Sequence, residues 1–250
     1  MAERVEPAHG DDVDGEAGAA PEPRRPRLPF WASLLLNVVV AIAVVAVVQA
    51  LWVKVYSVPS GSMENTLEVG DRMLVNRTAY PDGMADSQDV VVFTANEDWA
   101  TPASSEGAVE NAVRTFGDLT GIGRSHEQAL VKRVVGTAGQ TVECCTAEGA
   151  VTVDGEPLDE PYIHNDLPFI RDELDCESEV MSARCFGPVT VPEDSMLVLG
   201  DHRSNSADSV IACRGIPADQ AGDCARFVTR EDIVGEVFVT VWPPTHWGGH

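Results

Sequence analysis

Lysine is nearly absent from this sequence. The 250 residues include 17 basic side chains, but only Lys54 and Lys132 are lysines and the rest are arginines. Basic residues are also outnumbered by 40 acidic ones, which gives a formal net charge of −23. Nucleic-acid binding depends on clustered lysines and arginines, so this balance argues against a nucleic-acid partner. A hydrophobic content of 44% still provides enough apolar material for a folded core.

Charged residues are missing altogether between Leu28 and Val53. As an α-helix this stretch would extend about 39 Å, which is enough to cross a bilayer. Trp31 and Trp52 lie near its ends, where aromatic rings favour the membrane interface. A cleavable secretory signal would have a shorter apolar region, of roughly 7–15 residues, followed by small residues at the cut. We therefore predict a transmembrane helix over residues 29–53.

The two sides of this helix differ in composition. Residues 1–28 are acidic and rich in Ala, Gly and Pro, so we expect a disordered tail, which ends in the basic patch Arg24, Arg25 and Arg27. Basic residues favour the cytoplasmic side of a membrane. The N-terminus is therefore expected in the cytoplasm and residues 54–250 outside it, as in a single-pass type II protein of the cell membrane.

All cysteines lie on the predicted outer side, where disulfides persist. The candidates for disulfide bonding are Cys144, Cys145, Cys176, Cys185, Cys213 and Cys224. The last four form two closely spaced couples, for which local pairing is the simplest expectation. The first two are adjacent and could pair with each other or elsewhere, and the sequence does not decide the connectivity. Zinc is the alternative, but no CxxC or closely spaced histidine pair is present, so we predict structural disulfides and no metal.

Short β-branched stretches recur in the outer segment and predict a mainly β domain. The expected strands are Met73–Val75, Val90–Phe93, Val131–Val135, Val151–Val153, Val189–Val191, Met196–Leu199 and Ile233–Trp242. A polar, Ala-rich insertion over residues 94–128 interrupts them. Within it, Val109, Val113, Phe116 and Leu119 fall at helical spacing, which indicates a packing face or, alternatively, a membrane-surface helix.

Three polar segments of this domain carry residues with catalytic potential. The first, VPSGSMENTLEVGDRMLVNR at residues 58–77, places two serines in a turned loop directly after the apolar helix. The second, VKRVVG at residues 131–136, sets a lysine among valines. The third, LGDHRSNSADS at residues 199–209, is a polar loop after an apolar strand.

Together these segments resemble the type I signal peptidases, membrane-anchored serine proteases that remove secretory signal peptides. They are similar, in order, to that family's S-x-S-M-x-P-T-L segment with its G-D-x-x-x-V turn, its K-R-V-V-G strand and its G-D-N-R-x-x-S-x-D-S-R loop. VDGEPLDEPYI at residues 153–163 also resembles a connecting segment of the family. The resemblance extends over most of residues 29–245. It implies a β catalytic core with a smaller cap-like region inserted at about 143–195.

By position in these motifs, the resemblance implies Ser62 as nucleophile and Lys132 as general base. Ser60 would donate to the oxyanion together with the Ser62 amide, and Ser206 would orient the lysine by a hydrogen bond. The supporting residues would be Arg133, Asp201 and Asp208. The implied partners are signal peptides of secretory preproteins, lipids of the cytoplasmic membrane and the secretion machinery. No metal or organic cofactor is implied.

Physical chemistry makes this Ser/Lys assignment coherent. A serine hydroxyl needs a nearby base, and a lysine is a base only when its pKa is lowered by desolvation. Burial among Val131, Val134 and Val135 would have this effect, whereas an arginine would stay protonated. Because Lys54 lies at the membrane edge, Lys132 is the one lysine available to the outer domain.

The sequence departs from the family pattern at three positions. Asn65 stands in place of the usual proline, which loosens the φ restriction on the nucleophile loop. His202 replaces an asparagine, and Val210 replaces the final arginine, so Asp208 loses the partner that the pattern provides. None of these is a catalytic group, and we expect altered loop stability with activity retained.

Three other functions remain open at this point. A Ser-His-Asp hydrolase would use a residue such as His202, although no G-x-S-x-G elbow or S-x-x-K motif is present. A self-cleaving repressor with a Ser/Lys pair would be cytoplasmic and would carry a DNA-binding segment. A catalytically silent, membrane-anchored binding protein is favoured by the three departures.

Overall fold

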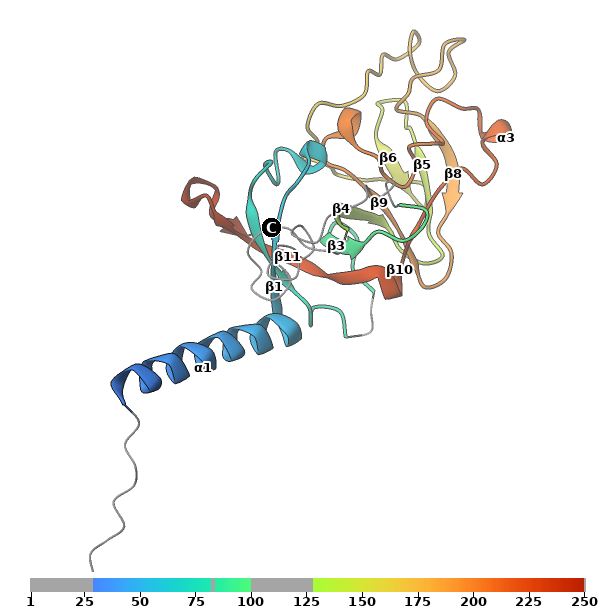
Figure 1. The fold of residues 1–250 in the computed structure, drawn as a ribbon. Helices are drawn as coiled ribbons and strands as arrows, with labels where there is room; N and C mark the ends of the chain where they lie inside the picture. Colours follow the sequence, from blue (N-terminus) through green and yellow to red (C-terminus); the bar gives the residue numbers. More distant parts are fainter. Residues whose placement is uncertain (1–28, 82–83, 100–127, 250) are drawn as a thin grey trace, which may run out of the picture. The chain divides into compact units, whose positions relative to one another are not determined.

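The computed structural model describes residues 29–81, 84–99 and 128–249 (Figure 1). The chain divides into two units within its first helix, Met1–Val39 and Val40–His250. The predicted tail over residues 1–28 lies outside the described residues. So do residues 100–127, which include the helical pattern predicted in the insertion.

The first helix, α1 (Phe30–Leu51), is formed by an uncharged run of 22 residues. Its large apolar side chains are exposed, as expected of a helix that faces lipid instead of a protein core. Among the described residues it is the one helix long and apolar enough to cross a membrane. It ends before the predicted limit at residue 53, because Val53 already pairs as the first residue of a strand.

A large antiparallel sheet forms the centre of the domain. Its strands are β1 (Val53–Ser57), β2 (Arg72–Asn76), β3 (Val90–Thr94), β4 (Ala129–Gly136), β9 (Ser195–Leu199), β10 (Val228–Thr229), β11 (Ile233–Trp242) and β12 (Gly248–Gly249). The order is β1-β2-β11-β3-β4-β9-β10, with β12 paired to β11. The late strand β11, red in Figure 1, therefore lies between the early strands β2 and β3.

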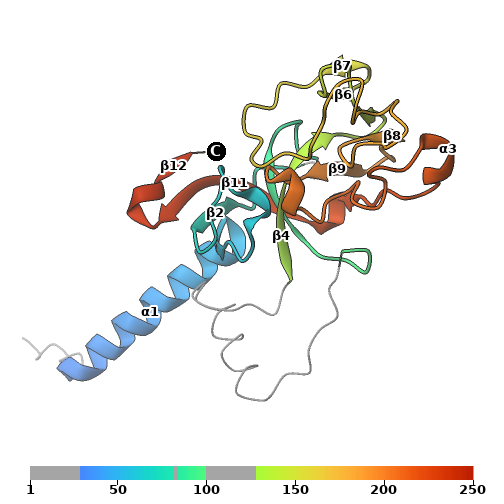
Figure 2. The ribbon, with the colours of Figure 1, turned by 90° about the horizontal axis from the view of Figure 1, so that it is seen from above.

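A second, smaller sheet is built from the chain between β4 and β9, which are neighbours in the large sheet. Its strands are β5 (Thr141–Cys144), β6 (Val151–Val153), β7 (Glu156–Pro157) and β8 (Phe186–Thr190), in the order β7-β6-β5-β8. Figure 2 shows it gathered at one end of the large sheet. This is the part of the chain in which an inserted cap-like region is expected, and the limits of that region stay a prediction.

Short helices and disulfides complete the domain. The helices are η1 (Gly61–Met63), η2 (Arg203–Asn205), α3 (Ala218–Ala221), η3 (Arg230–Asp232) and η4 (Pro244–His246). The structure joins Cys144 to Cys145, Cys176 to Cys185 and Cys213 to Cys224.

Both faces of the large sheet are covered by apolar side chains. On β3, Val90 and Val92 belong to a core cluster that includes Met63, whereas Val91 and Phe93 belong to a different cluster. Alternating residues of one strand thus pack on opposite faces, which is the arrangement of a strand buried on both sides. The neighbouring strand β4, which carries the predicted base, also contributes apolar side chains to both of these clusters.

Gly136, the last residue of β4, lies where the chain passes from the large sheet to the small one. A Cβ atom at this position would lie 2.5 Å from Val142 Cγ2 and 3.2 Å from Val191 Cγ2. Overpacking of this kind costs about 1–3 kcal/mol, so we expect Gly136→Ala to lower the free energy of unfolding by that amount. Urea denaturation of the full chain in detergent measures it. Gly248→Ala is the control, because a Cβ there meets nothing within 4 Å; equal midpoints for the two variants would contradict the expectation.

Candidate active site

The predicted nucleophile lies in a short, well-anchored loop. Ser62 is the central residue of η1 and is 7% exposed. The next residue, Met63, is completely buried in the core, and so is Leu67, one turn later. These two side chains fix the loop while the Ser62 hydroxyl remains at the edge of the core.

The predicted base approaches this hydroxyl from the centre of the sheet. Lys132 lies on β4, opposite Val91 of β3, and is 4% exposed. Its Nζ atom is 2.6 Å from Ser62 Oγ and 3.1 Å from the Val131 carbonyl oxygen. The fold therefore brings together two side chains that are 70 residues apart in the chain.

Burial makes the Lys132 amine a usable base. Desolvation lowers the pKa of Lys132 from 10.5 to about 8, with a smaller lowering by the Arg226 guanidinium. The carboxylates of Asp208 and Asp201 act in the opposite direction and limit the fall in pKa. With a pKa of about 8, roughly a tenth of the amine is neutral at pH 7, against a few parts in ten thousand for an ordinary lysine.

The hydrogen bond expected between Ser206 and Lys132 is not formed in this structure. Ser206 is 5% exposed, and its Oγ atom has no hydrogen-bond partner among the described residues. The Ser206 side chain instead packs against Gly200. A Cβ atom on residue 200 would overlap the Ser206 hydroxyl, so the glycine leaves room for this serine. A buried hydroxyl without a partner is uncommon, because losing its bonds to water costs about 1–3 kcal/mol.

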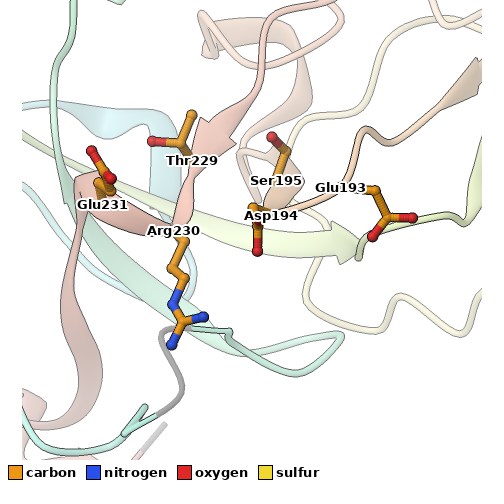
Figure 3. Close-up of a pocket in the computed structure, with 6 residues that line it drawn as sticks. All are labelled: Glu193, Asp194, Ser195, Thr229, Arg230 and Glu231. Carbon is orange, nitrogen blue, oxygen red and sulfur yellow. The ribbon is translucent and has the colours of Figure 1, made fainter.

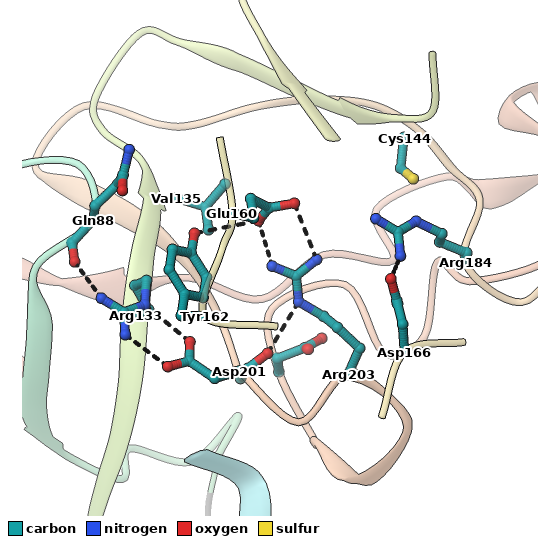
Figure 4. Close-up of polar contacts among 12 residues, drawn as sticks. Gln88, Arg133, Val135, Cys144, Glu160, Tyr162, Asp166, Arg184, Asp201 and Arg203 are labelled. Carbon is teal, nitrogen blue, oxygen red and sulfur yellow. Dashed lines mark hydrogen bonds and ion pairs between the residues drawn. The ribbon is translucent and has the colours of Figure 1, made fainter. Parts of the chain in front are cut away.

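Two of the predicted supporting residues, Arg133 and Asp201, form an ion pair beside the site (Figure 4). Arg133, next to the base on β4, binds Asp201 through two contacts, Nε to Oδ1 at 2.9 Å and Nη2 to Oδ2 at 2.6 Å. Thr66 of the nucleophile loop donates its hydroxyl to the same Oδ2 at 2.5 Å. The guanidinium also stacks 3.9 Å from the ring centroid of Tyr162. The bidentate pair thus holds β4, the nucleophile loop and the loop after β9 in one arrangement.

Asp208 is also paired, contrary to the expectation from Val210. Its side chain is completely buried and lies 3.2 Å from Nη2 of Arg214. Val210, which replaces the arginine of the family pattern, is itself buried in the core cluster between the sheets. Arg214, four residues after Val210, therefore supplies the positive charge that pairs with Asp208. Position 210, where the family pattern has its arginine, belongs to the hydrophobic core in this chain.

A third ion pair near the site was not anticipated from the sequence. Arg203 at the start of η2 binds Glu160 through Nη2 and Oε1, and both side chains are almost completely buried. Arg203 also donates through Nε to the Gly200 carbonyl at 3.0 Å. Figure 4 shows this pair next to the Arg133–Asp201 pair. One indication of this pair is present in the sequence, because Glu160 and Arg203 both fall inside motif segments, at residues 153–163 and 199–209.

The remaining predicted residues occupy the two loops that meet at the nucleophile. Ser60 is exposed and directly precedes η1, and its part in an oxyanion hole stays a prediction. His202 is buried, and its backbone amide donates to the Ser62 carbonyl at 3.1 Å. The His202 ring points its Nδ1 atom at Glu64 Oε2, 2.6 Å away.

The backbone conformation of Asn65 explains why this chain has an asparagine where the family pattern has a proline. It adopts a φ of +82°, in the left-handed region that asparagine tolerates better than most residues. Proline is locked near a φ of about −65° and cannot adopt this conformation. The Asn65 side chain also donates from Nδ2 to the Tyr162 carbonyl at 3.2 Å. The sequence predicted only a looser φ restriction at residue 65. The structure shows that the loop takes up a φ that proline cannot adopt.

A separate pocket lies away from these groups (Figure 3). It is formed where β9 begins and where β10 continues into η3. Its lining residues are Glu193, Asp194, Ser195, Thr229, Arg230 and Glu231. None of them is a predicted site residue, so this pocket is not the candidate active site.

Comparison with known proteins agrees with the geometry. A family model described as signal peptidase, peptidase S26, matches residues 31–242. The chain is 32% identical to a probable signal peptidase I of Mycobacterium leprae, over 97% of this chain and 86% of that protein. It is 33% identical to signal peptidase I of Mycobacterium tuberculosis, over 97% and 83% respectively. A crystal structure of a signal peptidase I from Enterococcus faecalis gives a TM-score of 0.32 at 18% identity, covering 62% of this chain and 97% of that one.

A serine whose hydroxyl contacts a buried lysine characterises one class of hydrolase, the serine endopeptidases with a Ser/Lys pair, and this chain is one of them. Within that class it belongs to the signal peptidase family, peptidase S26. The predicted mainly β fold, preceded by one apolar helix, is confirmed.

The conformation of Asn65 gives a test of the nucleophile loop. Asn65→Pro forces φ out of the left-handed region and should lower the free energy of unfolding by roughly 1–3 kcal/mol. Asn65→Gly adopts the same φ without strain and should stay close to the wild type. Thermal unfolding of the full chain in detergent compares the two. A proline variant as stable as the wild type would mean that the loop does not need the left-handed conformation.

Proposed function

We propose that this protein cleaves signal peptides from secretory preproteins, with Ser62 as nucleophile and Lys132 as general base. The observation that carries the proposal is the 2.6 Å contact between Lys132 Nζ and Ser62 Oγ, made by an amine that is 4% exposed. Membership of the signal peptidase family and the names of the relatives support the choice of substrate.

The two side chains suffice for acyl transfer. The neutral Lys132 amine takes the hydroxyl proton as Ser62 Oγ attacks the scissile carbonyl carbon, and the carbonyl oxygen becomes an oxyanion. The Ser62 amide and the Ser60 hydroxyl are the proposed donors to that oxyanion. When the peptide bond breaks, Lys132 returns the proton to the leaving amine and an acyl-enzyme remains. A water molecule, deprotonated by the same lysine, then releases the acid and regenerates Ser62.

The hydrogen-bonding capacity of Lys132 supports an orienting role for Ser206. A neutral amine has one lone pair and two N–H groups. In this neutral form the lone pair would accept the Ser62 hydroxyl across the 2.6 Å contact, while one N–H is donated to the Val131 carbonyl. Within the described part of the chain the second N–H has no acceptor, and the buried Ser206 hydroxyl has no hydrogen-bond partner. Pairing these two groups when the site closes on a substrate would fix the lone pair toward Ser62.

The membrane location supports the same function. We propose that the chain is a membrane protein anchored by α1, the one helix among the described residues that is long and apolar enough to cross a bilayer. We propose that its N-terminus is cytoplasmic and that the catalytic domain lies outside, near the lipids and the secretion machinery from which preproteins emerge. The arginines before the helix support this orientation, as does the joining of all six cysteines of the domain in disulfides.

The two lysines of the chain provide a matched test of the base. Lys132→Arg keeps the charge but removes the titratable amine, and should lower kcat/KM for preprotein cleavage by at least about 10³-fold. Lys54→Arg makes the same change outside the active site and should cleave at close to the wild-type rate. Cleavage of a purified preprotein, followed by gel electrophoresis, compares them. Full activity in Lys132→Arg would exclude lysine as the base, and binding without cleavage by the wild type would favour a catalytically silent binding protein.

The lowered pKa of Lys132 predicts the pH dependence of cleavage. The base is active only when neutral, so kcat/KM should rise about tenfold per pH unit below pH 8 and level off above it. Steady-state rates between pH 6 and 10 measure this limb. His202→Ala should retain a limb at the same pH. A limb near pH 6.5 that disappears in His202→Ala would instead favour the Ser-His-Asp alternative.

A further inference from the structure

Three potential metal ligands meet beside the nucleophile loop. Glu64, His164 and His202 each offer one ligand atom, and these atoms all lie within 4.8 Å of one another. They come from three separate segments: the residue after η1, the loop between β7 and β8, and the residue before η2. The active-site chemistry described above uses none of these side chains.

The backbone holds the two histidines in place. The His164 amide donates to the Asp201 carbonyl at 2.8 Å, and the His202 amide donates to the Ser62 carbonyl at 3.1 Å. The two residues form an isolated parallel bridge, and their rings lie edge to face with centroids 5.0 Å apart. The positions of the imidazoles are therefore set by main-chain contacts that do not depend on an ion.

Glu64 is held over the same site because residue 61 has no side chain. Its Oε2 atom lies 2.6 Å from His202 Nδ1. A Cβ atom on Gly61 would lie 2.5 Å from Glu64 Oε1, so any larger residue there would push the carboxylate away. Glu64 and His164 are half-buried while His202 is buried, which leaves the cluster a side that is open to solvent.

We propose that Glu64, His164 and His202 bind a divalent transition-metal ion, with Zn²⁺ as the best fit. Two imidazoles and one carboxylate form a known three-ligand zinc set that leaves a further position for water. Imidazole nitrogens select zinc and its neighbours over Mg²⁺ or Ca²⁺, which take oxygen ligands. Bringing the three ligand atoms onto one ion needs only side-chain movement, because they already lie within 4.8 Å of one another.

Metal binding should slow cleavage, an effect that rests on the proposed function. Two ligand atoms on a tetrahedral zinc ion are about 3.3 Å apart, given bonds of about 2.0–2.1 Å. Glu64 Oε2 and His202 Nδ1 are 2.6 Å apart without metal, so they must separate when the ion enters. Both residues are linked to Ser62: Glu64 follows it by two residues in the chain, and the His202 backbone amide donates to its carbonyl oxygen. A displacement that reaches Ser62 would disturb its contact with Lys132, and misplacement by about 1 Å costs about 10²-fold in rate.

Zinc titration of the full chain, purified in detergent without a histidine tag, tests the site directly. Competition with a chromophoric chelator should show one Zn²⁺ per chain, and His164→Asn, His202→Asn and Glu64→Gln should each weaken binding by at least tenfold. His246→Asn is the matched control, because His246 contacts Asp71 outside the cluster, and it should bind as the wild type does. Co²⁺ should give d–d absorption bands of a four- or five-coordinate ion in the wild type but not in His164→Asn.

The rate of preprotein cleavage supplies the second measurement. Added Zn²⁺ should lower the wild-type rate at least tenfold, and the inhibition should be lost in His164→Asn when each variant is compared with its own metal-free rate. Zinc binding that is unchanged in both histidine variants, or no stoichiometric binding at all, would overturn the site. If metal-free wild type cleaves no preprotein, the proposed function fails, whereas the zinc titration still decides whether the site exists.

Discussion

Burial of the Lys132 amine against the Ser62 hydroxyl is the interaction on which the rest of this structure depends. A lysine whose pKa is lowered by desolvation needs surroundings that exclude water, and β4 runs between β3 and β9 with apolar clusters on both faces of the sheet. Lowering the pKa of Lys132 to about 8 corresponds to roughly 3 kcal/mol of disfavoured charging. The core therefore supplies the basicity of the site as well as the stability of the domain.

Arginines perform the other cationic tasks near the site. Arg133 on β4 pairs with Asp201 in the loop after β9, and Arg203 in that loop pairs with Glu160 between β7 and β8. Arg214, in the disulfide-closed loop at Cys213, pairs with Asp208. An arginine remains charged when buried and can bind a carboxylate with two donors, whereas burial readily lowers the pKa of a lysine. The near absence of lysine thus matches a division of roles, with permanent charges for the scaffold and one titratable amine for the chemistry.

The sequence predicted the features that depend on local pattern. Hydrophobic stretches located most of the longer strands, but not β1, because the apolar run of α1 continues into Val53. They also missed β5, whose four residues include only one valine, and the two-residue strands, which carry too little pattern. The resemblance of three motifs to those of the type I signal peptidases singled out Ser62 and Lys132. Contacts between distant segments could not be predicted: the Glu160–Arg203 pair, the replacement of a motif arginine by Arg214, and the meeting of Glu64 with His164 and His202 all depend on the folded topology. The positive φ of Asn65 likewise depends on its tertiary contact with the 160s segment.

The pKa of Lys132 is the quantity that tests this account most directly, and a chain with two lysines allows it to be measured in isolation. NMR of the full chain in micelles, labelled with ¹³C at lysine Cε, should give two signals, and Lys54→Arg should leave the one from Lys132. Titration of that signal should give a pKa of about 8. A value near 10.5, the ordinary value for lysine, would contradict the account, because the amine would then be charged at the pH where it must accept a proton.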